Sequence, residues 1–531
     1  MNSVKVLDCT LRDGGYCNSW KFGYENIKKI IKGLCESGIN IIECGFLTNK
    51  IKYDPDISKF NNISQAEKII PENINRKNFV LMLNYGEYNP EDLPEYNNLS
   101  PLDGLRLAFH KKDMAEALKL CRKIQDKGYK LYIQAMVSLN YSDSEFLNLI
   151  DQVNLIQPHA FYIVDSFGAM KGRELTRLFY MTENNLNKNI YIGFHSHNNL
   201  QLAYSNAQKI LSESTRNNLI LDTAVYGMGR GAGNLNTELF VEYLNENILI
   251  DDDAKHYKIN PLLNIIDEVL NDFYQRNYWG YSLPNYISAV HNAHPNYAGW
   301  LAEKNTLTVE NMNEIFDMMD EDKKNSFDKN YISELYKRYM SAGSIHEEHT
   351  ADLIKNISGK KILLIAPGKS SLTERDRVIE FAKRDDVINI SVNFEYKYIE
   401  TDYIFISNLR RYRELDPAKK FKCIVTSNIV DDGIYLRVKY SSLSNSEGFV
   451  SDNAGLMAIK FFMNYEIDGI YLAGFDGYSH DTFENYADDK MTVITKNAIF
   501  DTMNEGMQKI LNEYSSEISI KYLTEPMHVK I

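Results

Sequence analysis

The sequence predicts an α/β protein: a (β/α)8 TIM barrel, then a helical extension, then a C-terminal Rossmann-like α/β domain. Three observations lead to this fold class. Short apolar runs alternate with amphipathic segments over the first half, helical periodicity alone continues past the middle, and a new alternation starts near the last third. A length of 531 residues accommodates three such parts. We expect the barrel at 1–252, the extension at 253–357 and the Rossmann-like domain at 358–531.

The barrel is predicted from eight apolar, β-branched runs, the strand number of a (β/α)8 barrel. The segments between them have helical spacing, and an open doubly wound sheet rarely needs eight such units in succession. Helices are expected at Tyr24–Ser37, Met114–Lys127, Ser144–Ile156 and Asn199–Ser212. The predicted strands are Val4–Asp8, Ile39–Gly45, Phe79–Leu83, Leu102–Ala108, Lys130–Met136, Ala160–Val164, Ile190–Phe194 and Leu219–Ala224.

Composition argues against several classes of partner. Acidic residues number 72 and basic residues 59, and the resulting net charge of −13 disfavours non-specific binding to nucleic acid or to an anionic membrane. No apolar run is long enough to span a membrane, and the first residues show no secretory pattern. Six scattered cysteines without a CxxC pair favour reduced thiols. We therefore expect a cytoplasmic protein.

A His-x-His at the end of the predicted seventh strand indicates a metal site. Residues i and i+2 of a strand face the same way, so His195 and His197 present neighbouring imidazoles to one space. Two imidazoles and a carboxylate form a common divalent-metal set, and Asp13 after the first strand supplies the carboxylate. Because barrel active sites lie at the carboxyl ends of the strands, we expect a metal centre at this rim.

Five separated motifs resemble one superfamily. LDCTLRDGG, IIECGF, VDSFG, GFHSHNN and GRGAGNLNTE occur in the order and spacing of the DRE-TIM metallolyases, the HMG-CoA-lyase-like superfamily, over the first 250 residues or so. The resemblance is closest to the 4-hydroxy-2-oxovalerate aldolases. It implies that Asp13, His195 and His197 hold a divalent ion, Mn2+ or Mg2+, with Asn234 near a fourth ligand position.

The same resemblance implies carbon–carbon bond chemistry next to a 2-oxo acid. Such a reaction passes through an enolate, whose negative charge a divalent cation spreads as a Lewis acid. Arg12, from the namesake Asp-Arg-Glu set, is suited to the developing enolate oxygen. Glu43, from the same set, is better suited to orienting Arg12 or bound water than to reacting. We expect an aldolase that uses a pyruvate-type 2-oxo acid and an aldehyde.

The general base stays open among three candidates. The hydroxy-oxovalerate aldolases place a histidine where this chain has Tyr16, and a phenol with a pKa near 10 is a poor base at neutral pH. His110, after the fourth strand, titrates in the better range if it points inward, and a metal-bound hydroxide is the third candidate. An acyl-CoA-dependent Claisen condensation is the alternative chemistry, although the chain lacks the glutamine that follows RDG in acyl-CoA-using members.

The helical extension contains an aromatic-rich stretch with two histidines, His291 and His294. We expect this stretch to form a tight helical core in preference to a lid that contacts substrate over the barrel mouth. The predicted helices of the extension are Leu262–Tyr274, Val309–Met319 and Ile332–Met340.

The last domain opens with a buried strand at Ile362, a Gly-Lys-Ser turn and a helix at Glu374–Arg384, which is typical of a Rossmann-like unit. Neither a P-loop nor GxGxxG is present. The pattern loosely resembles Rossmann-like domains of some sialyltransferases and of pterin-pyrophosphokinase-like proteins, which pair Gly-x-Ser with a late Gly-x-Asp. This pattern implies a nucleotide or phosphosugar site. In it, Gly368, Lys369 and Ser370 would bind a phosphate, and Asp476 would bind a ribose or sugar hydroxyl.

Two hypotheses follow for the role of the tail. In one, the barrel performs aldol chemistry and the tail handles a nucleotide-activated sugar, a setting that fits surface-polysaccharide biosynthesis. In the other, the tail binds a nucleotide or a partner and regulates or localises the barrel. Related barrels also lead us to expect a homo-oligomer, a dimer.

Overall fold

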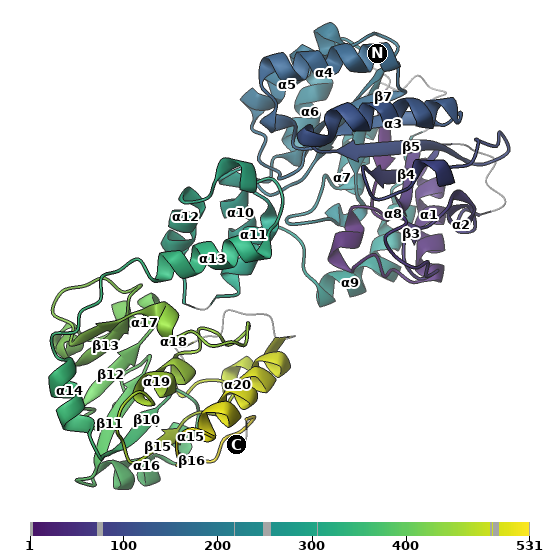
Figure 1. Ribbon diagram of the computed structural model, residues 1–531. Helices are drawn as coiled ribbons and strands as arrows, with labels where there is room; N and C mark the ends of the chain where they lie inside the picture. Colours follow the sequence, from purple (N-terminus) through teal and green to yellow (C-terminus); the bar gives the residue numbers. More distant parts are fainter. Residues whose placement is uncertain are drawn as a thin grey trace. The chain divides into compact units, whose positions relative to one another are not determined.

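The computed structural model of the chain describes residues 4–71, 78–216, 218–247, 256–304, 306–488, 491 and 499–529. They belong to two compact units, Met1–Pro295 and Asn296–Ile531, each with its own parallel sheet (Figure 1). The predicted boundary between barrel and extension, at residues 252 and 253, lies outside the described residues. The three-part division therefore remains a prediction.

Among the described residues of the first unit, eight parallel strands close into a barrel, as the sequence predicts. The strands of this sheet are β1 (Val4–Asp8), β2 (Ile41–Leu47), β3 (Lys59–Phe60), β4 (Phe79–Asn84), β5 (Leu102–Phe109), β6 (Lys130–Ala135), β7 (Ala160–Asp165), β8 (Tyr191–Ser196) and β9 (Leu219–Thr223). Their order is β1-β9-β8-β7-β6-β5-β4-β2, and pairing of β1 with β2 closes the ring. The short β3 pairs with the end of β2.

The helices of the barrel form because apolar residues recur every three or four positions. In α1 (Tyr24–Ser37), the side chains of Ile27, Ile31 and Leu34 are buried on one face. Gly38 ends this helix in the left-handed conformation, at φ +83°. The other helices of the unit are α2 (Ile63–Glu67), α3 (Met114–Asp126), α4 (Asp143–Ile156), α5 (Gly172–Asn185), α6 (Ala203–Glu213), α7 (Thr237–Asn247), α8 (Asn260–Ile265), α9 (Asn271–Arg276) and α10 (Leu283–Val290).

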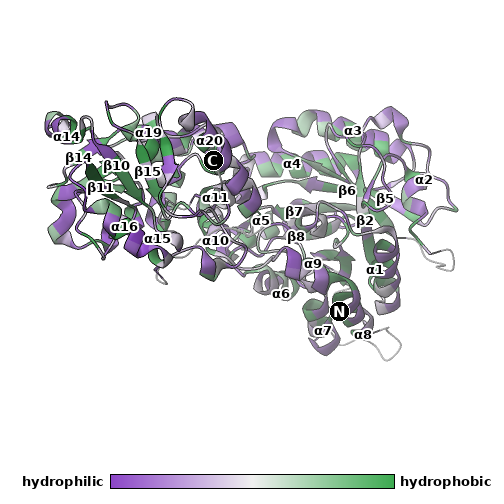
Figure 2. Cartoon of the chain, turned by 90° about the horizontal axis from the view of Figure 1, so that it is seen from below, coloured by the Kyte–Doolittle hydropathy of each residue, from purple (hydrophilic) through white to green (hydrophobic). Residues whose placement is uncertain are grey.

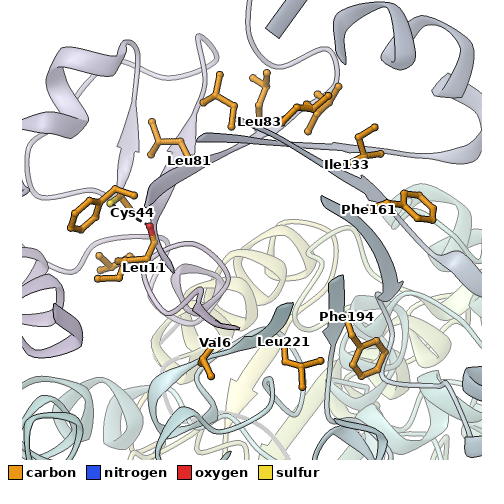
Figure 3. Close-up of a cluster of buried hydrophobic side chains, with 14 of the residues drawn as sticks. Val6, Leu11, Cys44, Leu81, Leu83, Ile133, Phe161, Phe194 and Leu221 are labelled. Atoms are coloured by element: carbon orange, nitrogen blue, oxygen red, sulfur yellow. Dashed lines mark hydrogen bonds between the residues drawn. The ribbon is translucent and has the colours of Figure 1, made fainter. Parts of the chain in front are cut away.

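Side chains alternate between the two faces of the barrel wall, because successive residues of a strand point in opposite directions. Phe161, Phe194 and Leu221 point outward in Figure 3 and belong to the main apolar core, which also contains the buried faces of the helices. Tyr162 and Asp222, the next residues of β7 and β9, are buried and lie on the other face of the wall. The barrel interior therefore holds polar groups as well as apolar ones.

The predicted extension is helical in the structure. A π-helical turn at Ile266–Leu270 joins α8 to α9, so this helix runs over the predicted Leu262–Tyr274 segment. The remaining helices are α11 (Pro295–Ala302), which begins at the last residue of the first unit, and α12 (Val309–Asp317), α13 (Lys329–Met340) and α14 (Thr350–Ile357) in the second unit. None of the helices within the described ranges has the length and apolar character that a bilayer-spanning helix requires.

The second unit contains a parallel α/β sheet of seven strands in its described part. The strands are β10 (Lys361–Ile365), β11 (Val387–Val392), β12 (Tyr403–Ile406), β13 (Cys423–Thr426), β14 (Leu436–Val438), β15 (Ile470–Ala473) and β16 (Ile520–Tyr522). Their order is β14-β13-β12-β11-β10-β15-β16. Figure 2 shows hydrophobic residues concentrated on the central strands and hydrophilic residues on the outer helices. The helices are α15 (Ser370–Thr373), α16 (Arg375–Ala382), α17 (Leu409–Glu414), α18 (Tyr440–Leu443), α19 (Ala454–Phe462) and α20 (Phe500–Ser515).

Candidate active site

The predicted metal-binding side chains meet at the carboxyl-end rim of the barrel. Asp13, His195 and His197 are buried, and one ligand atom of each lies within 4.8 Å of the others. His197 Nε2 is 3.7 Å from Asp13 Oδ2, and the two imidazole centroids are 5.3 Å apart. His195 belongs to β8 and His197 follows its last residue, two positions further along the extended chain, while Asp13 lies in the turn that follows β1.

Asn234 lies against this cluster, in the loop that follows β9. Its Nδ2 donates to Asp13 Oδ2 at 2.8 Å and to the Met228 carbonyl at 3.0 Å. Gly229 must lack a side chain here, because a Cβ would approach Asn234 Nδ2 to 2.1 Å and Asp13 Oδ2 to 2.8 Å. The glycine-rich loop therefore packs its backbone directly against the carboxylate of the cluster.

The cluster fits a divalent cation on its own chemistry. His197 Nδ1 and Asn234 Oδ1 are buried, and neither has a hydrogen-bond partner in the part of the chain that the structure describes. Burial, opposed by Asp13 and aided by the charge of Arg230, lowers the pKa of His197 to about 3. Burial alone raises the pKa of Asp13, but His197 and Arg12 hold it well below its usual range. A neutral His197 imidazole beside an ionised carboxylate is therefore available at neutral pH.

A chain of buried ion pairs connects Arg12 with the metal-binding cluster through the barrel interior. Arg12 Nε is 2.8 Å from Glu43 Oε2, and the same oxygen is 2.9 Å from Arg106 Nη1. Arg106 Nη2 pairs with Asp222 Oδ2, which in turn lies 3.0 Å from His195 Nδ1. The Arg12 and Arg106 guanidiniums balance two of the carboxylates, so both arginines stay charged and the groups hold one another in position.

Asp222 is a site residue that sequence analysis missed. Its carboxylate faces His195 Nδ1, which orients the imidazole and leaves Nε2 for a metal ion. Opposing the effect of burial, Arg106 and His195 lower the pKa of Asp222. The available signal was a charged residue in the middle of an apolar strand, in LILDT. Such a residue is buried at a cost unless it has a partner.

Arg230 forms a second cationic centre at the mouth. Its Nη2 donates to the Ser166 carbonyl at 2.9 Å, and its Nη1 is 3.2 Å from His294 Nε2. The guanidinium also lies 5.3 Å from the centroid of the Tyr16 ring. Arg230 Nε is buried and has no hydrogen-bond partner among the described residues, and no carboxylate of those residues forms an ion pair with this arginine.

The base candidates lie around Arg230. Tyr16 is 41% exposed, and burial of its phenol group raises its pKa, which keeps it protonated. His110 is half-buried at the end of β5; burial, and then Lys112, lower its pKa, to which the nearby charge of Arg230 also contributes. Burial and Arg230 also lower the pKa of His294. The structure thus places both predicted candidates, Tyr16 and His110, at the rim. It also places His294 there, a residue to which the sequence analysis assigned no function.

The predicted phosphate-binding residues of the tail, Gly368, Lys369 and Ser370, lie after β10 and beside Asp476. The Ser370 amide donates to Asp476 Oδ2 at 2.7 Å, and the Ser370 hydroxyl donates to the other carboxylate oxygen. Lys369 Nζ is 3.0 Å from Glu484 Oε1. A Cβ on Gly368 would approach Asp476 Oδ2 to 2.6 Å. The structure therefore brings these residues together. The Asp476 carboxylate, however, accepts hydrogen bonds from the Ser370 amide and hydroxyl, the groups that were predicted to bind a phosphate.

Comparison with known proteins finds relatives of the first half of the chain. Residues 106–266 match the HMGL-like family. A 4-hydroxy-2-oxovalerate aldolase from Geobacillus genomosp. 3 is 25% identical over 277 residues, which cover 49% of this chain and 78% of the relative. An oxaloacetate decarboxylase from Mycobacterium tuberculosis is 25% identical over 243 residues, 45% of this chain and 69% of the relative. The solved HMG-CoA lyase from Brucella melitensis is 14% identical with a TM-score of 0.40, covering 52% of this chain and 99% of its own. At the level of the family, the sequence relatives support a metal-dependent carbon–carbon lyase or aldolase, and the first unit of the chain is an HMGL-like, or DRE-TIM, barrel.

Proposed function

We propose that the barrel makes or cleaves a carbon–carbon bond next to a pyruvate-type 2-oxo acid, with Mn2+ or Mg2+ held by Asp13, His195 and His197. The observation that supports this most directly is the Arg12 guanidinium. Its Nε faces Glu43 and its Nη1 donates to Asp13 at 2.6 Å, while Nη2 is buried without a hydrogen-bond partner among the described residues. A buried N–H group held beside the metal cluster suits an oxygen that becomes negative during the reaction.

The charges of the site suit an anionic substrate. Within the chain of buried ion pairs, Arg12 and Arg106 are positive, whereas Asp13, Glu43 and Asp222 are negative, so two positive and three negative groups leave one negative charge. A divalent cation held by Asp13, His195 and His197 would supply Lewis-acid stabilisation of the enolate. With that cation the balance would become one positive charge, which a single 2-oxo carboxylate neutralises. The buried network therefore favours one cation and one monoanion together.

In the cleavage direction, a base removes the proton of the 4-hydroxyl group and the carbonyl of the aldehyde forms. The electrons of the breaking carbon–carbon bond pass to the 2-oxo acid as an enolate, whose oxygen accepts a hydrogen bond from Arg12 Nη2. The enolate carbon then takes up a proton to give the 2-oxo acid. We assign the base to His110, because its lowered pKa leaves the imidazole neutral and no hydrogen bond within the described residues occupies it. Tyr16, whose pKa is raised, is the matching proton donor.

Proton exchange of pyruvate tests this function without knowledge of the aldehyde. The full chain is loaded with Mn2+ or Mg2+ and incubated with pyruvate in deuterated water, and loss of the methyl signal is followed by NMR. We expect exchange that requires the metal and stops when a chelator removes it. Absence of exchange, together with absence of cleavage of 4-hydroxy-2-oxo acids, would contradict an aldolase. Release of free CoA from an acyl-CoA plus a 2-oxo acid would instead support the Claisen alternative.

The His110→Gln variant tests the base. The lowered pKa leaves His110 neutral at pH 7 and protonated only in more acidic solution, so the parent rate should fall as the pH drops through that pKa. We expect the variant to react about a hundred-fold more slowly and to lose this acidic limb of the pH–rate profile. His159→Gln is the matched control, because His159 precedes β7 at the other end of the barrel. An acidic limb that survives in His110→Gln would contradict the assignment.

Arg230 favours an aldehyde that carries an anionic group. Its buried Nε lacks a partner among the described residues, and a charge-assisted hydrogen bond from such a group contributes about 1.5–3 kcal/mol. We expect Arg230→Gln to lower kcat/KM for glyceraldehyde 3-phosphate at least about ten-fold, with little change for glyceraldehyde. Arg177→Gln, which removes an exposed arginine paired with Asp143, should change neither. Equal losses for both aldehydes would show that Arg230 has no part in recognising the anion.

A further inference from the structure

The second unit has a cavity at the switch point of its sheet. Strands β11 to β14 extend from one side of β10, whereas β15 and β16 lie on the other side, so the strand order reverses between β10 and β15. Ligands of open parallel sheets bind outside the carboxyl ends of the strands at this point. The cavity has a volume of about 140 Å³, and its lining includes Gly368 after β10, Asn393 after β11 and Gly474 after β15.

Both acidic residues of the cavity wall already have partners. Asp476 accepts hydrogen bonds from the amide and hydroxyl of Ser370. Asp452 Oδ2 accepts from the hydroxyls of Thr306 and Tyr336, at 3.2 Å each. These hydrogen bonds stabilise both carboxylates, so neither needs a cationic ligand from outside the wall.

Arg410 supplies the unengaged positive charge. Arg410 lines the cavity, its backbone amide donates to Asn408 Oδ1 at 3.0 Å, and no residue of the described ranges forms a hydrogen bond or an ion pair with its guanidinium. The adjacent Arg411 also lines the cavity and is 3.1 Å from Glu414 Oε2. Asn393 accepts from the Ser407 amide at 3.0 Å, which fixes its side chain, and its NH2 group has no partner among the described residues. A planar guanidinium beside an amide NH2 group suits a phosphate.

The rest of the wall is aromatic and apolar. Phe475, Tyr478 and Tyr486 line it, together with Met503 and Met507. The Tyr478 ring is held in place by Phe500, with centroids 5.7 Å apart and the rings stacked. Flat aromatic faces beside thioether side chains accommodate a planar heterocycle, which stacks favourably on such rings. One cavity thus offers a phosphate site and a surface for a planar ring.

We propose that this cavity binds a nucleotide, with its phosphate at Arg410 and Asn393 and its base against the aromatic wall. The inference is independent of the chemistry of the barrel. It moves the phosphate away from Gly368, Lys369 and Ser370, because Asp476 already occupies the Ser370 amide. Gly368 instead lines the cavity, and the hydrogen bonds between Ser370 and Asp476 fix the turn that follows β10.

Binding of CMP, UMP, AMP and GMP to the full chain tests the proposal by isothermal titration calorimetry, with the free nucleosides and inorganic phosphate as further probes. We expect at least one nucleotide to bind with a Kd below about 1 mM, and at least about ten-fold more tightly than its nucleoside or inorganic phosphate. Arg410→Gln should weaken this binding at least about ten-fold. Arg413→Gln is the matched control, because Arg413 lies on the same helix and pairs with Glu310 at 3.0 Å outside the cavity.

A second variant tests the cavity by filling it with a larger side chain instead of removing a charge. Ala454 lines the cavity and is only half-buried, so Ala454→Phe should obstruct the space without overpacking the core. We expect it to abolish nucleotide binding while pyruvate exchange by the barrel continues at the parent rate. Absence of binding by all four nucleotides, or equal binding of inorganic phosphate, would overturn the proposal. Unchanged affinity in Arg410→Gln would overturn the phosphate assignment.

Discussion

Asp13→Asn should abolish tight binding of Mn2+ and lower the rate of pyruvate proton exchange at least about a thousand-fold. Asp13 is the single carboxylate of the metal-binding cluster, and asparagine of the same shape removes its charge. The charge balance of the network then changes from one negative charge to none, which removes the attraction for a cation. The same change removes the ion pair that Arg12 Nη1 makes at 2.6 Å. Calorimetric titration with Mn2+ and NMR exchange measure the two effects separately.

Asp8→Asn is the matched control for this experiment. Asp8 is also a buried aspartate near the end of β1, where it accepts hydrogen bonds from the Thr10 amide and the Thr237 hydroxyl. Burial raises its pKa to about 6, so a neutral amide replaces a group that is already partly neutral near pH 6. We expect metal affinity and exchange to remain near the parent values. Unchanged Mn2+ affinity in Asp13→Asn would show that the metal, if any, lies elsewhere.

The fold of the barrel was predictable because periodicity is a local property of the sequence. Each predicted barrel strand overlaps an observed one, and the strand at Val4–Asp8 has the same bounds. The helix predicted at Asn199–Ser212 begins later, at Ala203. Hydrophobic periodicity could not predict this later start. Asn199 is fixed by hydrogen bonds to the Phe167 carbonyl and from the Ala232 amide, and both partners are distant in the sequence.

The second sheet also contains an element that local periodicity could not predict. The predicted opening strand of the tail, at Ile362, lies within β10, but β16 was not predicted. Its sequence, Ile520–Tyr522, is only three residues long, and no residue in it is fully buried. An edge strand of this length carries too few apolar positions to differ from a loop. Its pairing with β15 is a tertiary contact, so only the folded chain reveals it.

Some residues of the candidate site could be predicted from the sequence, and others could not. Asp13, His195 and His197 could be grouped from the sequence, because the carboxyl ends of the strands of a parallel barrel all meet at one rim. Asp222 and Arg106 could not be assigned in this way, because their pairing joins residues 116 positions apart across the barrel interior. That pairing depends on strand tilt and register, which determine the inward residues that meet.

Arg12→Lys should slow pyruvate exchange about a thousand-fold while changing Mn2+ affinity only a few-fold. Arg12 directs Nε to Glu43 and Nη1 to Asp13, and only its planar fork leaves Nη2 for the enolate oxygen. A lysine ammonium preserves the charge beside Asp13 but cannot hold these three directions at once. The split between rate and metal affinity is therefore the signature of a group that acts on the enolate. Arg276→Lys, which alters an exposed arginine 2.8 Å from Asp272, should change neither quantity. An equal loss of rate and of metal affinity would instead mean that Arg12 serves only to position Asp13.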